Sequence, residues 1–202
     1  MSNPLRIKNV LGTEIMQYIP IVAKLRMEIF HDFPYLYDNT LAYEEKYLSI
    51  YTHAPNFLLV LVFDGEEIVG ASTGVPLEHV FKTGDNLQRL QTYNYSPANL
   101  FYLSESVLKN TYRGQGIGVR FFEERENYAK SLGQFTYTCF CAVQRPIDHP
   151  KRPADYVPLD NFWHKRGYIK HPELQMTFAW KDVDEEKKSL KAMNFWMKPL
   201  DN

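Results

Sequence analysis

The sequence predicts an α+β domain in which helices cover both faces of a central sheet. Two apolar runs, residues 57–63 and 68–73, flank Asp64-Gly65, and an Asp-Gly pair between such runs is a strong signal for a β-hairpin. Both runs are apolar at nearly every position, which is typical of strands buried on two faces. Amphipathic helical patterns on either side of the hairpin can supply the covering layers.

The segment before the hairpin predicts one strand and two helices. Residues 5–10 form a short apolar strand, and Pro20 suits the first turn of the helix that follows. An aromatic loop over residues 31–39 then leads to Thr40, a good cap for the second helix. The expected apolar face of the first helix consists of Ile21, Val22, Leu25 and Ile29.

The segment after the hairpin begins with residues 76–98, where weak periodicity predicts a long loop or short helices. Gly133 is expected to adopt a left-handed conformation and end the predicted helix over residues 117–132. No repeat, low-complexity segment or linker divides the chain, so we expect one domain over residues 1–202. The other expected elements are strand 100–108, helix 117–132, strand 135–143, a proline-rich loop at 145–158, helix 159–166, and strands 174–181 and 193–198.

Composition excludes several classes of function. Lys and Arg number 23 against 24 Asp and Glu, so the chain lacks the basic excess of a nucleic-acid-binding protein. No apolar run is long enough to cross a bilayer, and the first residues lack the apolar stretch of a signal peptide. We therefore expect a cytoplasmic protein with neither a nucleic-acid nor a membrane partner.

The two cysteines, Cys139 and Cys141, alternate along one predicted strand and therefore share a face. Neighbours this close along a strand rarely meet disulfide geometry. The simpler interpretation is a pair of small core residues, and a thiol nucleophile or metal-ligand pair is the alternative. The His-Pro pairs at 149 and 171 show no ligand spacing, so we expect no metal.

Three glycines, at positions 114, 116 and 118, lie between a predicted strand and a predicted helix. Without a Cβ they let backbone N–H groups approach an anion, and the helix N-terminus adds free donors. A Walker A loop needs Gly-Lys-Ser/Thr, whereas Val119 follows Gly118, and the spacing differs from a Rossmann fingerprint. A phosphate or pyrophosphate is the predicted ligand, and an ordinary tight turn is the alternative.

The motif RGQGIG at residues 113–118 resembles the Gln/Arg-x-x-Gly-x-Gly/Ala signature of GNAT N-acetyltransferases. Residues 108–112 resemble the strand-to-turn segment before that signature, and residues 162–168 resemble the later helix-Gly-aromatic element. Together with the order of elements, the resemblance covers nearly the whole chain. It implies three α/β/α layers around a mixed, mostly antiparallel sheet of about seven strands, with a splayed V between the fourth and fifth strands.

The resemblance implies transfer of an acetyl group from acetyl-CoA to a primary amine by direct attack. Backbone amides of residues 113–118 would hold the pyrophosphate, and main-chain groups of residues 107–109 would pair with the pantetheine arm. An N–H near Leu108 would polarise the acetyl carbonyl. The implied acetyl-CoA-binding residues are Val107, Leu108, Lys109, Arg113, Gly114, Gln115, Gly116, Ile117, Gly118, Val119 and Trp163.

The catalytic base is not fixed by the resemblance. Glu105 is the only carboxylate on the strand where the family places its base, which makes it a candidate base or acceptor ligand. Counting from Leu108 along a regular strand places residues 102 and 104 on the acceptor side instead, although a bulge would reverse this. A carboxylate that only belongs to a polar network, or a base acting through water, are the alternatives.

The catalytic acid is also open, because Trp163 stands where many members have a tyrosine that reprotonates the thiolate. An indole N–H is not acidic enough for that step, so Trp163 is expected to pack or to contact adenine. Tyr156 and Tyr168 are the substitute acids, and each could instead be a core tyrosine. A thiolate that leaves unassisted needs neither.

By the same resemblance, residues 31–39, residues 76–98 and the final strand pair would line the acceptor pocket. A small-molecule amine or a peptide suits it, and aminoglycoside, polyamine, amino acid and protein N-terminus all stay open. Other readings are a CoA-binding regulatory module without turnover and a transferase of a longer acyl group, and such folds often form homodimers. The side chains expected in the pocket are Asp32, Tyr35, Tyr37, Asp38, Tyr93 and Tyr95.

Overall fold

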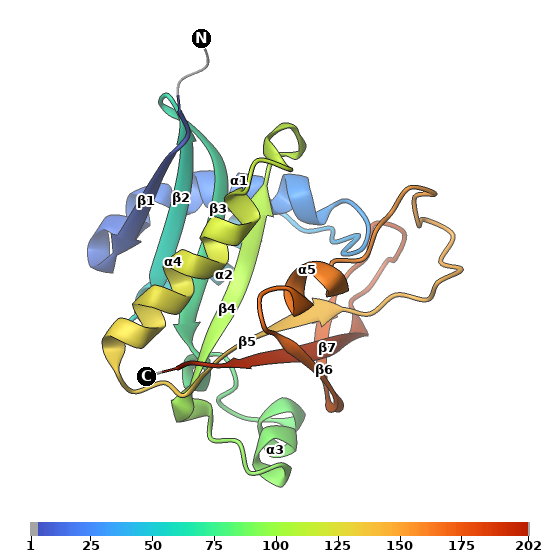
Figure 1. Cartoon of the computed structure of the whole chain (residues 1–202). Coiled ribbons are helices and arrows are strands. Elements are labelled where there is room, and N and C mark those ends of the chain that lie inside the picture. The colour runs from blue at the N-terminus through green and yellow to red at the C-terminus, as the bar shows by residue number, and fades with distance from the viewer. Residues whose placement is uncertain (1–3, 202) are drawn as a thin grey trace.

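The computed structural model describes residues 4–201. The prediction that the first residues form no signal peptide therefore lies partly outside the described residues. One seven-stranded sheet runs through the molecule in the order β1-β2-β3-β4-β5-β7-β6. Only the β4–β5 pair is parallel (Figure 1). The strands are β1 (Arg6–Leu11), β2 (Leu58–Asp64), β3 (Glu67–Pro76), β4 (Leu100–Leu108), β5 (Tyr137–Val143), β6 (Ile169–Trp180) and β7 (Ser189–Pro199).

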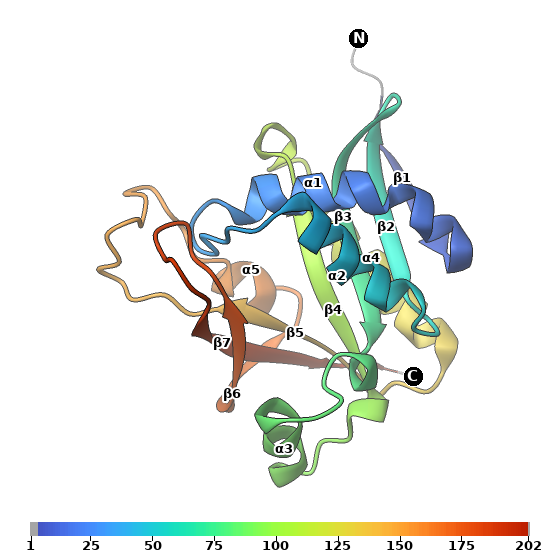
Figure 2. The same ribbon diagram turned by 180° about the vertical axis from the view of Figure 1, so that it is seen from behind.

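Helices cover the sheet on both faces, which confirms the three-layer prediction (Figure 1, Figure 2). On one face Leu59 and Leu61 of β2 join a core with residues of α1 and α2. On the other face Val60 and Val62 pack with Phe121 of α4. The helices are α1 (Ile19–Phe30), α2 (Leu41–Thr52), α3 (Asp85–Thr92), α4 (Ile117–Leu132) and α5 (Asp160–His164).

The predicted local signals act as expected at most element ends. The hydroxyl of Thr40 accepts a hydrogen bond from the N–H of Tyr43 at 3.3 Å and caps α2. Gly133 ends α4 at a φ of 70°. The expected apolar face of α1 is wrong at Ile21, which is exposed, while Arg26 is buried. Consecutive residues lie about 100° apart around a helix, so Ile21 falls outside the stripe through Val22.

The last strand pair is longer than the sequence predicts. β6 begins at Ile169 rather than at 174, and its pairing with β7 shifts register between His171 and Met176. β6 is the edge strand of the sheet, where a proline such as Pro172 is tolerated. Because its first residues are mostly exposed, no apolar alternation marks them in the sequence.

The V between the fourth and fifth strands is present. β4 pairs with β5 only from Leu100 to Tyr102, and beyond Tyr102 the two strands diverge (Figure 1). β4 nevertheless continues to Leu108 along its other neighbour, β3. One edge of β4 is therefore free of a neighbouring strand over its second half.

β4 also contains the bulge that decides where Glu105 points. Ser72 pairs with Ser106 and Gly74 with Leu103, so one residue of β3 faces two residues of β4. The extra residue brings Glu105 to the face that carries Tyr102, towards α1 and α2. The regular-strand count, which set Glu105 apart from that face, is corrected by this irregularity.

Candidate active site

The turn between β4 and α4 presents a row of free backbone donors. Gly114 and Gly116 adopt φ angles of 77° and 83°, which side-chain-bearing residues rarely adopt. A Cβ at either glycine would meet no heavy atom within 4 Å, so this side of the turn is open. Within residues 4–201, no group accepts a hydrogen bond from the N–H groups of residues 114–118. These donors and the positive end of α4 fit a pyrophosphate.

Gly118 serves a different purpose from the other two glycines. A Cβ there would lie 3.2 Å from the ring of Phe162, so the glycine lets α5 pack closely against the first turn of α4. Arg113 is exposed beside the turn, whereas Ile117 is buried under it and Val119 is half-buried. The residues predicted to hold the pyrophosphate, called the cradle below, therefore divide into those with open N–H donors and those that pack against the core.

The free edge of β4 lies next to this cradle. The N–H of Lys109 donates to the carbonyl oxygen of Val69 on β3 at 3.0 Å. Main-chain groups of successive strand residues point to opposite edges, so the N–H of Leu108 points away from β3, into the V. Val107 is fully buried, and its side chain belongs to the core below the strand. Together, the free N–H groups of the cradle and the unpaired edge of β4 suit a ligand that carries a phosphate on a peptide-like arm.

Glu105 belongs to a buried ionic group. Arg26 Nη1 lies 2.6 Å from Glu105 Oε1, and Arg26 Nε donates to Glu44 Oε2 at 2.7 Å. Thr73 Oγ1 donates to the second oxygen of Glu105, and Tyr37 Oη donates to Glu44. Burial lowers the pKa of Arg26, but Glu105, then Tyr47 and Glu44, together outweigh it, so the pKa is raised and the guanidinium stays charged.

Arg125 of α4 supports the bulge from the opposite face of the sheet. Its Nη1 donates to the carbonyl oxygens of Thr73 and Glu105 at 3.2 and 3.1 Å, and its Nε donates to that of Phe121. The side chain is buried, and burial lowers its pKa to about 10. The irregular stretch of β4 is thus held by a guanidinium on each side.

The structure places Tyr168 away from Glu105, in the core beneath α4 and α5. Its hydroxyl lies 2.8 Å from Thr138 Oγ1 and donates to Glu126 Oε1 at 2.9 Å. Burial, followed by the nearby Glu126, raises the pKa of Tyr168 well above its ordinary value. A hydroxyl engaged in this way favours a structural role.

Tyr156 and Trp163 lie in different surroundings. The ring of Tyr156 packs edge-on against Phe33 at 4.7 Å, and the Arg152 guanidinium lies 4.8 Å from its centre. Within the described chain the hydroxyl of Tyr156 makes no hydrogen bond, and burial raises its pKa. Trp163 packs against Phe140 and Trp196, both at 5.1 Å, as the packing interpretation expects.

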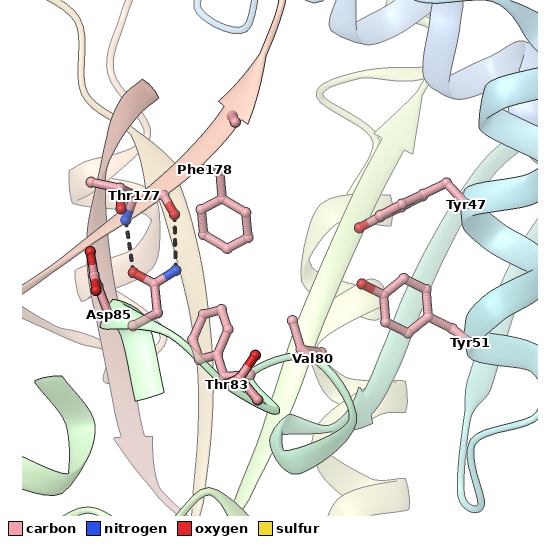
Figure 3. A pocket seen from close by; sticks show the side chains of 10 residues that line it. Tyr47, Tyr51, Val80, Thr83, Asp85, Thr177 and Phe178 are labelled. Carbon is pink, nitrogen blue, oxygen red and sulfur yellow. Dashed lines mark hydrogen bonds between the residues drawn. The ribbon is translucent and has the colours of Figure 1, made fainter. Parts of the chain in front are cut away.

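A pocket of about 400 Å³ opens on the face of the sheet that carries α2 (Figure 3). It is lined by Tyr47 and Tyr51 of α2, by residues in the stretch 80–86, and by residues 177–179 of β6. Two of the three segments expected to line an acceptor pocket contribute residues to this pocket. The third, residues 31–39, does not.

The loop over residues 31–39 is held outside the pocket by hydrogen bonds from Arg145. Arg145 donates to the carbonyl oxygens of Pro34 and Tyr35 at 2.8 and 2.6 Å, and it pairs with Asp182. Four other side chains expected in the pocket, from Tyr37, Asp38, Tyr93 and Tyr95, do not line it either. Tyr93 is exposed, Tyr95 packs against Tyr137 and His171, Tyr37 binds Glu44, and Asp38 pairs with Lys181.

Sequence reasoning missed Arg26, Glu44 and Arg125. Each lies on the apolar face of an amphipathic helix, and a charged residue in such a position signals a buried partner. Cys139 and Cys141 are free and buried on one face. Residues 4–201 contain no group of three potential metal ligands, and none of their helices is long and apolar enough to cross a membrane.

Comparison with known proteins places these features in a family. The model of the acetyltransferase (GNAT) family matches residues 23–153. A search of curated protein sequences found no significant match. A putative acetyltransferase from Acinetobacter baylyi superimposes with a TM-score of 0.62 at 13% identity, covering 100% of this chain and 96% of that one.

Two further structures share the fold. A ribosomal-protein-alanine N-acetyltransferase from Brucella melitensis has a TM-score of 0.59 at 12% identity, covering 96% of this chain and 99% of that one. A putative acetyltransferase from Salmonella typhimurium, solved with its cofactor acetyl-CoA, has a TM-score of 0.57 at 10% identity, covering 99% and 96%. With the family match over most of its length, this chain belongs to the GNAT acetyltransferase family.

Proposed function

We propose that the protein transfers the acetyl group of acetyl-CoA to a primary amine, which attacks the thioester carbonyl directly. The observation that carries this is one juxtaposition: the free N–H groups of residues 114–118 adjoin the free edge of β4. The first fits a pyrophosphate, and the second fits the amide-bearing pantetheine arm. The N–H of Leu108 points into the V and would stabilise negative charge on the carbonyl oxygen.

Glu105 is the candidate base in this proposal. It lies on the pocket face of β4, beyond the last residue paired with β5. A carboxylate offers about four acceptor positions, so its contacts with Arg26 and Thr73 leave it able to accept a hydrogen bond from an amine. Replacement by Gln should lower kcat and remove the acid-side limb of the pH–rate profile.

The cradle can be tested with two matched glycine variants. Gly116→Ala and Gly133→Ala both place a side chain at a left-handed position at an end of α4, where a Cβ meets open space. Each should lose about 1–2 kcal/mol of stability. Acetyl-CoA at about 100 times its Kd should stabilise the wild type and Gly133→Ala by about 2.7 kcal/mol, but not Gly116→Ala.

The readout is the thermal midpoint with and without acetyl-CoA, with NADH and ATP as control ligands. A folded wild-type protein that shows no shift with acetyl-CoA or with longer acyl-CoAs would overturn the proposed function. Equal increases of the thermal midpoint by acetyl-CoA in both glycine variants would indicate that acetyl-CoA binds away from the turn.

A second candidate function is acyl-CoA binding without turnover. Two observations favour it: Trp163 replaces a proton-donating tyrosine, and the Tyr168 hydroxyl is already bonded to Thr138 and Glu126. Release of free CoA thiol in the presence of amines separates the two functions. A panel of acyl donors with one acceptor tests the third reading, a preference for longer acyl chains.

A further inference from the structure

The pocket beside α2 has an aromatic interior. Tyr47 and Tyr51 of α2 lie across it from Phe178 of β6 (Figure 3). Phe81 also lines it, with ring centroids 5.8 Å from Phe178 and 6.1 Å from Tyr102 of β4. Because Tyr102 is the last β4 residue paired with β5, the pocket wall reaches the point where the V opens. Such a wall suits the apolar or aromatic body of a ligand.

One negative side chain lines the pocket, and a buried ionic group lies behind its aromatic wall. Among the described residues that line it, Asp85 alone carries a formal charge at neutral pH, and it is exposed at the start of α3. Behind Tyr47, Arg26 faces both Glu44 and Glu105, so these three residues carry one negative charge in excess on the pocket face, with Arg125 on the opposite face of the sheet. The arrangement favours a cation and opposes an anion.

Asn86 holds one wall of the pocket in place. Its Nδ2 donates to the carbonyl oxygen of Thr177 at 2.9 Å, and the N–H of Thr177 donates to its Oδ1 at 3.0 Å (Figure 3). This two-bond contact joins segments that are 91 residues apart and ties α3 to β6. Residues 80–86 are thereby fixed opposite α2, around a volume of about 400 Å³, suitable for a small molecule.

We propose that the acceptor is a small cationic amine with an aromatic or branched alkyl body and no carboxylate, and that Asn86 is a positioning residue for this selectivity. The inference rests on the proposed acetyltransferase function. The body lies between Tyr47 and Phe178, and the amino group is directed towards β4. With the amino group directed towards β4, an α-carboxylate on the adjacent carbon meets the excess negative charge of the buried group, and Asp85 adds repulsion from the rim of the pocket. A peptide has to continue past residues 80–86, which Asn86 holds in place.

The first experiment compares phenethylamine with phenylalanine, which share a body and differ by one carboxylate. At saturating acetyl-CoA, kcat/KM should favour phenethylamine by at least about tenfold, because like charges oppose each other in the pocket. Asp85→Asn should reduce this ratio severalfold. Glu66→Gln, which removes an exposed carboxylate from the β2–β3 turn, is the matched control and should leave the ratio unchanged.

The second experiment tests the contact made by Asn86. Asn86→Ala should raise KM for phenethylamine severalfold while kcat and the stabilisation by acetyl-CoA stay close to wild type. Gln88→Ala, at an exposed position of the same helix, is the control and should change none of the three. An equal loss of kcat and of acetyl-CoA stabilisation in Asn86→Ala would indicate general unfolding and overturn the positioning role.

Failure of this inference can be distinguished from failure of the proposed function, because acetyl-CoA binding is measured on its own. Suppose that acetyl-CoA stabilises the protein, but phenylalanine or a peptide N-terminus is acetylated faster than phenethylamine, or no small amine is acetylated at all. The inference is then overturned and the acetyl-CoA site stands. If acetyl-CoA does not bind, the proposed function fails and the inference falls with it. Preference for phenethylamine over phenylalanine and peptides, with the ratio to phenylalanine reduced severalfold in Asp85→Asn, supports it.

Discussion

Arg26 is the residue around which the buried polar groups of the pocket face are arranged. Its guanidinium is charged, nearly inaccessible to solvent and in contact with both Glu44 and Glu105. A carboxylate without a partner would be costly at this depth, since the charged form loses its hydration. Arg26 therefore supplies the opposite charge that the buried Glu105 needs beside the V.

Removal of the Arg26 charge should be strongly destabilising. Arg26→Met leaves two buried carboxylates facing each other, and we expect a loss of about 3–5 kcal/mol in the free energy of unfolding, measured by urea denaturation. Adding Glu105→Gln to this variant removes one of the charges and should recover part of the loss. A loss below about 1 kcal/mol in Arg26→Met would show that the group is not ionised.

The two candidate acids should respond oppositely to loss of their hydroxyls. Tyr168→Phe removes the hydrogen bonds to Thr138 and Glu126 and should cost about 1–3 kcal/mol of stability, without a change in the pH–rate profile. Tyr156→Phe breaks no hydrogen bond within the described chain. It should leave the thermal midpoint unchanged and, if Tyr156 is the acid, lower kcat at neutral pH, where the phenol is protonated, and remove the alkaline limb of the pH–rate profile. The reverse pattern would assign the acid to Tyr168.

At the scale of elements, the bulge in β4 determines which face of the strand carries Glu105. Without the extra residue, Glu105 would lie on the α4 face, under the helix that carries the cradle. Arg125 of α4 donates hydrogen bonds to the carbonyl oxygens of Thr73 and Glu105 at this bulge. The element that turns Glu105 towards the pocket is therefore also anchored to α4.

The turn between β6 and β7 predicts a pH dependence of stability. The backbone N–H of Asp182, then Lys191 and Ser189, lower the pKa of Glu185 to about 2. Because the folded pKa lies below the unfolded value of about 4.3, this carboxylate stabilises the fold above about pH 4.3, and the contribution is lost as pH falls towards 2. Thermal midpoints of Glu185→Gln should fall less steeply over that window than those of the wild type. Parallel curves would contradict the prediction.

At the scale of the whole molecule, the sheet consists of two parts joined by a short seam. Only the pairs from Leu100↔Tyr137 to Tyr102↔Cys139 connect β1–β4 to β5–β7. α4 adds a second connection, since Glu126 binds both Tyr168 and Lys198 on the far side of the V. A ligand that fills the V should therefore add a contact between two parts of the sheet whose strands pair over only three residues of β4.

Hydrogen exchange should report this coupling. Acetyl-CoA is expected to slow amide exchange in the turn at 113–119, along residues 103–108 of β4 and in β5, because the ligand contacts one arm and restrains the opening of the other. Gly116→Ala should show none of these changes at the same ligand concentration. Protection confined to residues 113–119 would indicate that the V does not hold the ligand.

Local signals account for much of what could be predicted. The Asp64-Gly65 hairpin, the Thr40 cap, the left-handed Gly133 and the glycine turn before α4 depend on backbone preferences of a few adjacent residues. Apolar runs predicted the two-sided burial of β2 and β3. Such features are readable because their energetics depend on neighbours in the chain.

The site around the V depends on residues that meet only after folding. Arg26, Glu44 and Glu105 come from α1, α2 and β4, and Asn86 reaches Thr177 across 91 residues. The bulge that turns Glu105 is a property of the β3–β4 pairing rather than of the β4 sequence alone. The sequence by itself therefore determined the elements and the glycine turn before α4, while tertiary packing decided which polar groups face the pocket. Partner choice in a core depends on how distant elements pack, and no local preference encodes that.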